Sequence, residues 1–304
     1  MEKADKIWMN GRLIPWDEAK IHVLTHGLHY GTGVFEGIKC YDTAKGPAIF
    51  RLKDHMQRMR NSAKIYQMPI PYFVDDLCAA AKETVRVNGY SACYIRPIAF
   101  YGYGEMGVNP RKNPVEVSII VWKWGAYLGE EGIEKGIRVM ISSWQRIDSR
   151  SLPTHAKATA NYANSVLAKL EALDLGFDEG IMLNSHGNLC EGSGENLFII
   201  KDGVLITPPP GAGALPGITW NSVITVAKDM GIPFEMRDLL REELMLSDEA
   251  FFTGTAAEVT PIREVDGRPI GNNGRGEITE RIQSKFFDIV NGRDSNYDRW
   301  LDFI

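Results

Sequence analysis

Residues 180–207, which decide the fold class, read GIMLNSHGNLCEGSGENLFIIKDGVLIT. The apolar runs Gly180–Leu183, Asn196–Ile200 and Val204–Thr207 have the length and the bounding turn residues that are typical of strands. Lys201-Asp202-Gly203 joins the last two runs as a hairpin-like turn. Because hairpins and helices do not alternate strictly along the chain, the pattern indicates an α+β fold rather than a regular doubly wound sheet.

Further elements are expected on both sides of this stretch. Ile137–Ser142 is a strand candidate, and Asn161–Leu175 is predicted to be a helix with Gly176 as its stop. One face of that helix would carry Ala163, Val166, Leu167 and Leu170. Another helix is predicted to begin with Thr219 as its cap and to end before Gly231.

The N-terminal half predicts a mixture of strands and helices. The strand candidates are Ile7–Asn10, Arg12–Pro15, Ala48–Phe50, Ala92–Tyr101 and Val115–Trp124. A first helix would open at Asp54, with Gln57 three residues later at the spacing of a capping box. A second helix would run from Val74 to Val87 and be closed by Asn88-Gly89.

The length of the chain, 304 residues, favours two domains. Residues 125–136 are rich in Gly and Glu and lack strand alternation, so they are expected to connect the domains. We therefore predict a small N-terminal domain over residues 1–123, an interdomain loop over residues 124–135 and a larger domain over residues 136–304.

Composition limits the classes of partner. A net charge of -5 without blocks of like charge favours a small molecule over a nucleic acid or a membrane. The N-terminus lacks the apolar core of a signal peptide, which leads us to expect a cytoplasmic protein. The four cysteines are widely spaced, so no zinc site or disulfide framework is expected.

One motif suggests a dinucleotide but fails in context. Residues 102–107 fit G-x-G-x-x-G after a strand-like run. That fingerprint needs a helix directly behind it, whereas Pro110 and Pro114 forbid a continuous helix there.

Two other segments could hold an anion. Leu215–Thr219 leads into a helix whose first backbone N–H groups lack internal partners, and Thr219 adds a hydroxyl. In Thr253–Ala257, small residues let backbone amides approach an anion. A plain capped helix and a tight structural turn are the alternatives, and either is adequate for its segment alone.

Lys157 and Glu191 complete the candidate chemistry. A partly buried Lys157 among small residues could form an imine with an aldehyde cofactor, although composition alone favours a solvated surface lysine. Glu191 stands beside glycines that would let a flat ring approach, and its carboxylate could hold a ring nitrogen protonated, although a plain turn is the simpler explanation for this motif alone. Together, a lysine, a carboxylate and an anion site are the groups that an aldehyde phosphate with a ring nitrogen needs.

With these motifs in this order, the chain resembles the branched-chain amino acid aminotransferases, which are fold-type IV pyridoxal-phosphate enzymes, over almost its whole length. The stretches that carry the resemblance are His29–Gly37, Tyr94–Pro97, Ala156-Lys157, Asn161-Tyr162, Glu191–Phe198, Leu215–Thr219 and Gly254–Glu258. The resemblance implies a two-domain fold, with a smaller α/β N-terminal domain and a larger C-terminal domain that has a pseudo-barrel β core.

The resemblance also implies a role for each cofactor contact. Lys157 would be the Schiff-base lysine and the group that moves the proton, Glu191 the partner of the pyridine nitrogen, and Tyr162 the partner of the phenolic oxygen. The phosphate would be held by Arg58, Ile218, Thr219 and Thr255.

For the substrate, the resemblance implies an apolar pocket of Phe35, Trp124, Val108 and Tyr30, the last two from a neighbouring subunit. The site therefore implies at least a homodimer and leaves a hexamer open. Tyr94 and Thr255-Ala256 would hold the α-carboxylate, and Arg96 the side-chain carboxylate of glutamate or 2-oxoglutarate. Lys39 stands where the family usually has arginine, so the role of that position is open.

The expected reaction is reversible transfer of the amino group of L-leucine, L-isoleucine or L-valine to 2-oxoglutarate. It is the last step in the biosynthesis of these amino acids and the first in their degradation. The alternatives are another fold-type IV enzyme, namely a D-amino acid or (R)-amine aminotransferase or an aminodeoxychorismate lyase, and a non-catalytic phosphate- or nucleotide-binding module.

Overall fold

The computed structural model describes residues 2–125 and 128–304 and divides the chain into two compact units. The first unit contains the residues up to Trp124, Ala156–Ala160 and Ile289–Ile304; the second contains Gly125–His155 and Asn161–Asp288. Residues 126–127 of the predicted interdomain loop lie outside the described residues.

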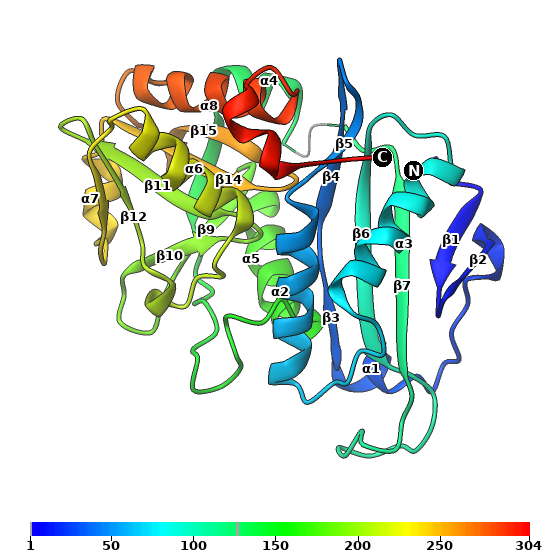
Figure 1. The fold of residues 1–304 in the computed structure, drawn as a ribbon. Helices are drawn as coiled ribbons and strands as arrows, with labels where there is room; N and C mark the ends of the chain where they lie inside the picture. The colour runs from blue at the N-terminus through cyan, green and yellow to red at the C-terminus, as the bar shows by residue number, and fades with distance from the viewer. Residues whose placement is uncertain (1, 126–127) are drawn as a thin grey trace. The chain divides into compact units, whose positions relative to one another are not determined.

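The first unit is built on an antiparallel sheet, which has eight strands in the described part of the chain. Its path is β17-β5-β4-β6-β7-β1-β2, and β3 pairs with β6 (Figure 1). The strands are β1 (Lys6–Met9), β2 (Arg12–Pro15), β3 (Gly33–Phe35), β4 (Ile38–Thr43), β5 (Gly46–Phe50), β6 (Cys93–Tyr101), β7 (Val115–Trp122) and β17 (Leu301–Phe303).

Two helices, α2 (Leu52–Ile65) and α3 (Val74–Val87), pack on this sheet and on each other. Met56, Met59 and Leu77 from these helices are fully buried in one core with Ile38 and Ile95 of the sheet. The shorter helices of the unit are η1 (Trp16–Glu18), α1 (His26–Tyr30) and η4 (Ser295–Trp300), while η2 (Thr159–Asn161) begins in it.

The second unit contains a closed ring of strands. In the described residues the ring runs β8-β9-β10-β11-β14-β15 and back to β8, so six strands close on themselves. Its strands are β8 (Ile137–Ile141), β9 (Glu179–Leu183), β10 (Leu189–Gly192), β11 (Asn196–Lys201), β14 (Glu249–Gly254) and β15 (Glu258–Val265). Three of the described strands lie outside the ring. β12 (Val204–Thr207) pairs with β11, β13 (Phe234–Met236) pairs with β12, and β16 (Arg268–Pro269) pairs with β15.

The helices of this unit are α4 (Glu130–Lys135), α5 (Tyr162–Asp174), η3 (Pro210–Ala212), α6 (Ile218–Asp229), α7 (Arg241–Met245) and α8 (Glu277–Val290). Alternate strand residues face opposite ways. Leu197 of β11 and Phe252 of β14 therefore enter one buried cluster, while Asn196 and Thr253 project from the other face. Helix α6 packs against β14.

The α+β class and the β-barrel core are confirmed, but details of three predicted helices were wrong. Helix α2 is capped by Arg51 in the left-handed region, φ 50°, and Asp54 lies in the first turn, where its carboxylate accepts from Arg51 Nε at 2.6 Å. Helix α6 is capped by Gly217, so Thr219 is its second residue. In both cases the helix begins earlier in the sequence than the polar residue that was predicted as its cap.

The third difference concerns the apolar face of α5. Val166, Leu167 and Leu170, predicted to share a face, are exposed, whereas the buried residues of the helix are Ser165, Ala168 and Ala172. Small residues lie against the sheet because α5 packs closely on β9: an added Cβ at Gly180 would lie 3.0 Å from the carbonyl oxygen of Ala168.

The C-terminal segment pairs with the first unit. Strand β17 pairs antiparallel with β5, with Leu301 opposite Phe50. The predicted domain boundaries, 1–123 and 136–304, stay a prediction; the first compact unit ends at Trp124 and includes residues 289–304 as well. No described helix is long and apolar enough to cross a membrane.

Candidate active site

Lys157 lies in a short segment that packs on β3. Its carbonyl oxygen accepts from Phe35 N at 3.0 Å, and its own N–H donates to Ser62 Oγ at 3.0 Å. Both neighbours, Ala156 and Ala158, are buried, while Lys157 itself is half-buried. Its Nζ lies 5.1 Å from the centroid of the Phe35 ring. The backbone of Lys157 is therefore fixed and its ammonium is held over an aromatic face.

Glu36, between β3 and β4, is bonded to two side chains of α2. The Nε and Nη2 atoms of Arg58 each lie 2.7 Å from a Glu36 carboxylate oxygen, and His55 Nδ1 lies 2.7 Å from one of them. Burial alone would raise the pKa of Glu36, but the charge and hydrogen bonds of Arg58 and His55 outweigh it and lower this pKa to about 2. Glu36 is thus an ionised, fully buried anchor for the predicted phosphate-binding arginine.

Aromatic side chains surround the guanidinium of Arg96 on β6. The guanidinium carbon lies 4.9 Å from the Phe35 ring centroid and 5.7 Å from that of Trp122, and Arg96 Nη2 donates to Tyr94 OH at 3.3 Å. Trp124 packs edge-on against Tyr94 at 4.6 Å. The predicted carboxylate-binding residues Tyr94 and Arg96 therefore lie together in an apolar setting with Phe35 and Trp124.

Lys39 projects from the same face of the sheet, because it is directly opposite Tyr94 in the β4–β6 pair. Its Nζ lies 5.2 Å from the Tyr41 ring centroid. The residue that departs from the family pattern is therefore a neighbour of the predicted carboxylate contacts.

Tyr30 and Val108 do not join this cluster in the single chain. Tyr30 ends α1 and is 41% exposed, and Val108 in the loop between β6 and β7 is 86% exposed. That loop contains the G-x-G-x-x-G match and has no helix over residues 102–114, all of which are described. Exposed apolar side chains at these positions suit a contribution to a neighbouring subunit.

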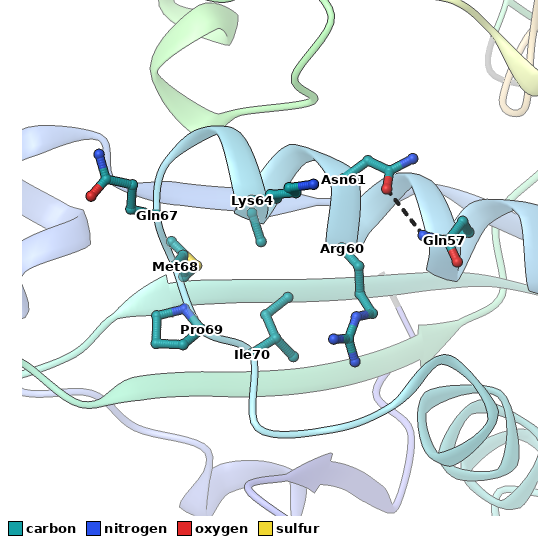
Figure 2. A pocket seen from close by; sticks show the side chains of 9 residues that line it. Gln57, Arg60, Asn61, Lys64, Gln67, Met68, Pro69 and Ile70 are labelled. Carbon is teal, nitrogen blue, oxygen red and sulfur yellow. Dashed lines mark hydrogen bonds between the residues drawn. The ribbon is translucent and has the colours of Figure 1, made fainter.

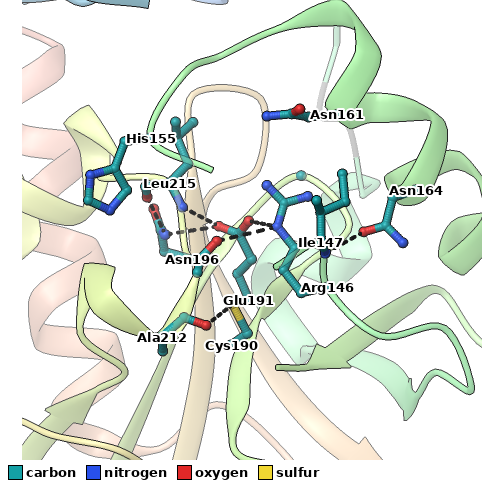
Figure 3. A network of polar contacts seen from close by, with 12 residues as sticks. Arg146, Ile147, His155, Asn161, Asn164, Cys190, Glu191, Asn196, Ala212 and Leu215 are labelled. Atoms are coloured by element: carbon teal, nitrogen blue, oxygen red, sulfur yellow. Dashed lines mark hydrogen bonds and ion pairs between the residues drawn. The ribbon is translucent and has the colours of Figure 1, made fainter. Parts of the chain in front are cut away.

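In the second unit, Glu191 is the centre of a buried polar network (Figure 3). Glu191 Oε1 pairs with Arg146 Nε at 2.8 Å, and Oε2 accepts from Leu215 N at 2.9 Å. Asn196 Nδ2 lies 3.5 Å from the same Oε2 and donates to the carbonyl oxygen of Leu215 at 2.8 Å. The network ties the carboxylate to the turn that leads into α6.

The start of α6 provides the predicted anion site. Gly217 has an ordinary φ of -71°, but a Cβ there would overlap with Asn196 Oδ1, so any side chain at this position would force Asn196 to move. Ile218 and Thr219 begin the helix, so their N–H groups belong to its first turn. Thr219 is buried. The helix therefore begins three residues after Leu215, whose N–H donates to Glu191.

Thr255 and Ala256 form the tight turn between β14 and β15 and are partly exposed. Their neighbour Ala257 is buried, and Glu258 takes a left-handed φ of 55°. Tyr162 is the first residue of α5, next to the buried Asn161, which donates to the carbonyl oxygen of Pro153 at 3.1 Å.

Three polar residues of these networks were not predicted: Glu36, His55 and Arg146. Glu36 lies inside the His29–Gly37 stretch, so an acid directly after a strand was the available signal. His55 lies three residues before Arg58, almost one helical turn away. Arg146 has no signal in the sequence, because only the β-strand arrangement brings it to Glu191.

The lining of a cavity of about 560 Å³ contains none of the predicted site residues. The cavity lies at the end of α2 and is lined by Gln57, Arg60, Lys64, Gln67 and Ile70, among others (Figure 2). Its polar side chains are mainly exposed amides and cations, and nothing in its lining indicates catalysis.

Residues 33–265 match the family amino-transferase class IV. This match covers more than half of the chain, so the chain belongs to the class IV aminotransferases. It is also 49% identical, over 99% of its length and 98% of the relative's, to a branched-chain-amino-acid aminotransferase of Salmonella typhimurium. Within the family, the chain is a transaminase of branched-chain amino acids, and the D-amino acid, (R)-amine and lyase alternatives are not favoured.

Solved structures agree. The crystal structure of the Escherichia coli branched-chain amino acid aminotransferase has a TM-score of 0.97 and 49% identity, covering 99% of each chain. The T.th. branched-chain amino acid aminotransferase with pyridoxamine 5′-phosphate has a TM-score of 0.96 and 50% identity, covering 100% of this chain and 99% of that one. These similarities confirm the fold-type IV architecture.

Proposed function

We propose that the chain binds pyridoxal 5′-phosphate, with Lys157 as its Schiff-base lysine, and transfers amino groups between branched-chain amino acids and 2-oxoglutarate. The observation that carries this proposal is the buried Glu191 network, which joins a carboxylate to the N-terminal turn of α6. A carboxylate for a ring nitrogen and a helix N-terminus for a phosphate are the contacts that this cofactor requires. The similar T.th. structure with pyridoxamine 5′-phosphate supports the same cofactor.

The donor set fits the cofactor in charge and in hydrogen bonding. Glu191 is a buried carboxylate bonded to the turn that leads into α6, and a carboxylate forms a charge-assisted hydrogen bond with a protonated ring nitrogen. Arg146 places its guanidinium against this buried carboxylate, with Nε 2.8 Å from Oε1. Ile218, Thr219 and Thr255 supply backbone amides and hydroxyls to the phosphate, together with Arg58, which is oriented by Glu36.

When bound, pyridoxal phosphate supplies an electron sink for the bond electrons at the substrate Cα. Lys157 would take the proton from the substrate Cα and deliver it to the cofactor's C4′ carbon, and its fixed backbone would keep the amine beside both carbons. Tyr162 donates to the phenolic oxygen. Phe35, Trp124, Tyr30 and Val108 exclude water around the branched side chain, the last two from a second copy of the chain in a homodimer at least.

The acidic substrate uses the same site. We infer that Tyr94 and the Thr255-Ala256 turn hold the α-carboxylate, and that Arg96 accepts the side-chain carboxylate of glutamate or 2-oxoglutarate. The aromatic contacts of Arg96 support this role. The rings of Phe35 and Trp122 can contact an apolar side chain, and the guanidinium that lies against them can bind an acidic one.

The test compares wild type, Lys157→Ala and the exposed-lysine control Lys64→Ala after incubation with pyridoxal phosphate and borohydride. Wild type and Lys64→Ala should show a visible absorption band that borohydride bleaches, with the reduced cofactor on the peptide that contains Lys157. Lys157→Ala should lack the band and lose at least about 1,000-fold in kcat, as for loss of a covalent and proton-transfer group. Attachment to another lysine would refute the assignment of Lys157.

Substrate choice is tested separately by steady-state kinetics with L-leucine, D-alanine and an (R)-amine, each with 2-oxoglutarate. We expect activity with L-leucine and at least about 100-fold lower kcat/KM with the other two, because their α-substituents are placed differently in the pocket. Activity with D-alanine but not with L-leucine would contradict the proposal.

A further inference from the structure

Thr253 on β14 continues a row of side chains that begins at Glu191. Glu191 of β10 is directly opposite Asn196 of β11, and Asn196 is directly opposite Thr253 of β14. Directly opposite residues in antiparallel pairs project from the same face of a sheet. The hydroxyl of Thr253 therefore lies on the face that carries the Glu191 carboxylate.

The same residue is aligned with the predicted phosphate contact. Thr255 follows two residues later, directly after the end of β14, in the turn that leads to β15. Gly254 between them has no side chain. Thr253 is thus the member of this row that is next in sequence to the Thr255 turn, and it lies on the strand against which α6 packs.

The hydroxyl of Thr253 has no hydrogen-bond partner among the described residues, although the side chain is 1% exposed. Buried hydroxyls nearby are satisfied: Thr207 Oγ1 donates to the carbonyl oxygen of Leu197 at 2.7 Å and Thr260 Oγ1 to that of Ala257 at 2.6 Å. A buried polar group without a partner is costly and is retained where something else binds it.

We propose that Thr253 is a further cofactor-positioning residue, whose hydroxyl hydrogen-bonds to the pyridoxal phosphate held by Glu191 and the α6 N-terminus. This inference rests on the proposed function, because it needs the same cofactor at the same face. A hydroxyl in this row restrains the cofactor between its carboxylate and its phosphate contacts, while Lys157 holds it covalently.

The test measures the non-covalent affinity for pyridoxamine 5′-phosphate, which lacks the Schiff base, by equilibrium dialysis. Thr253→Val, which removes the hydroxyl and keeps the shape, should raise Kd by about 3- to 10-fold, as for loss of one hydrogen bond. Thr253→Ser, which keeps the hydroxyl, should stay within about 2-fold of wild type. Thr260→Val is the matched control, because its hydroxyl already has a partner in the chain.

Thermal unfolding without cofactor gives the second readout. Thr253→Val should leave the Tm unchanged or raise it, since it removes an unsatisfied group, whereas Thr260→Val should lower it. An unchanged Kd for Thr253→Val, or a loss of Tm like that of Thr260→Val, overturns the inference. If wild type itself does not bind pyridoxamine 5′-phosphate, the proposed function fails, so the two failures are distinguishable.

Discussion

At the scale of single residues, Glu36 shows how a charge is kept in a core. The carboxylate is fully buried, yet Arg58 and His55 supply three contacts of 2.7 Å to its two oxygens. Removing one partner of such a group would leave a buried charge uncompensated, which is much more costly than the loss of one exposed ion pair.

The lowered pKa of Glu36 predicts a contribution to acid stability. Since this pKa falls from 4.5 to about 2 on folding, the stability it provides is present above pH 4.5 and is lost as the pH falls towards 2. Glu36→Gln should flatten the decline of the urea midpoint between pH 4.5 and pH 3 and should lower that midpoint at pH 7. Equal slopes in the two proteins would contradict this explanation, and Glu134→Gln at an exposed site is the control.

Glu195 predicts the opposite dependence of folding stability on pH. Its burial, followed by the nearby charge of Glu179, raises its pKa to about 8, although its carboxylate accepts a hydrogen bond from Gly194 N at 3.0 Å. The folded chain therefore keeps a proton that the unfolded chain loses above pH 4.5. Stability attributable to this group falls as the pH rises from 4.5 to 8, by up to about 1.4 kcal/mol per pH unit.

Glu195→Gln, which is neutral at every pH, should remove that decline. Its urea midpoint should exceed that of wild type at pH 8, and the excess should shrink towards pH 5. An equal difference in urea midpoint at pH 8 and pH 5 would show that the substitution acts through packing rather than through protonation.

At the scale of elements, α6 depends on the residue that precedes it. Gly217 allows Asn196 to reach Leu215 and Glu191, because a side chain at this position would occupy the place of the Asn196 amide oxygen. The start of α6 and the carboxylate of Glu191 are therefore positioned by the same contacts.

Gly217→Ala tests this coupling. The backbone φ of -71° suits alanine, so the helix should form, but Asn196 must move and the cofactor site should loosen. We expect about a 10-fold higher Kd for pyridoxamine 5′-phosphate with unchanged far-ultraviolet circular dichroism. Gly211→Ala, where an added Cβ meets nothing within 4 Å, should bind as wild type does; equal Kd values for the two variants would disprove the coupling.

Elements with a strong local pattern could be predicted from the sequence. The helix Val74–Val87 and the strand Val204–Thr207 have the predicted bounds, since apolar periodicity and the glycines at 89 and 203 determine them locally. The caps of α2 and α6 could not be predicted, because Arg51 and Gly217 are selected by tertiary contacts. Motif order indicated Lys157 and Glu191 as candidates, but Arg146 and the orphan hydroxyl of Thr253 depend on strand register, which local patterns do not encode.

At the scale of the whole molecule, the exposed apolar residues predict an assembly. Val108 is 86% exposed and Tyr30 41%, whereas the resemblance gives both a place in a substrate pocket. Exposing such side chains to water is unfavourable in free energy, and association with a second chain would bury them.

Val108→Asp should therefore shift the assembly towards monomers. Light scattering after size exclusion should give a mass of at least two chains for wild type and a lower mass for the variant at micromolar concentration. The KM for L-leucine should rise as well. Val87→Asp, at an exposed position on α3, is the control; a variant at position 108 with unchanged mass and KM would rule out a shared site.

The pairing of β17 with β5 has a consequence for synthesis on the ribosome. The edge of the first sheet is completed only by Leu301–Phe303, after the whole second unit has been translated. Until those residues emerge, the nascent chain exposes the hydrogen-bonding edge of β5, which is a template for pairing with other chains. Premature termination even a few codons before position 301 should therefore yield polypeptides that aggregate or are degraded, rather than a slightly shortened enzyme.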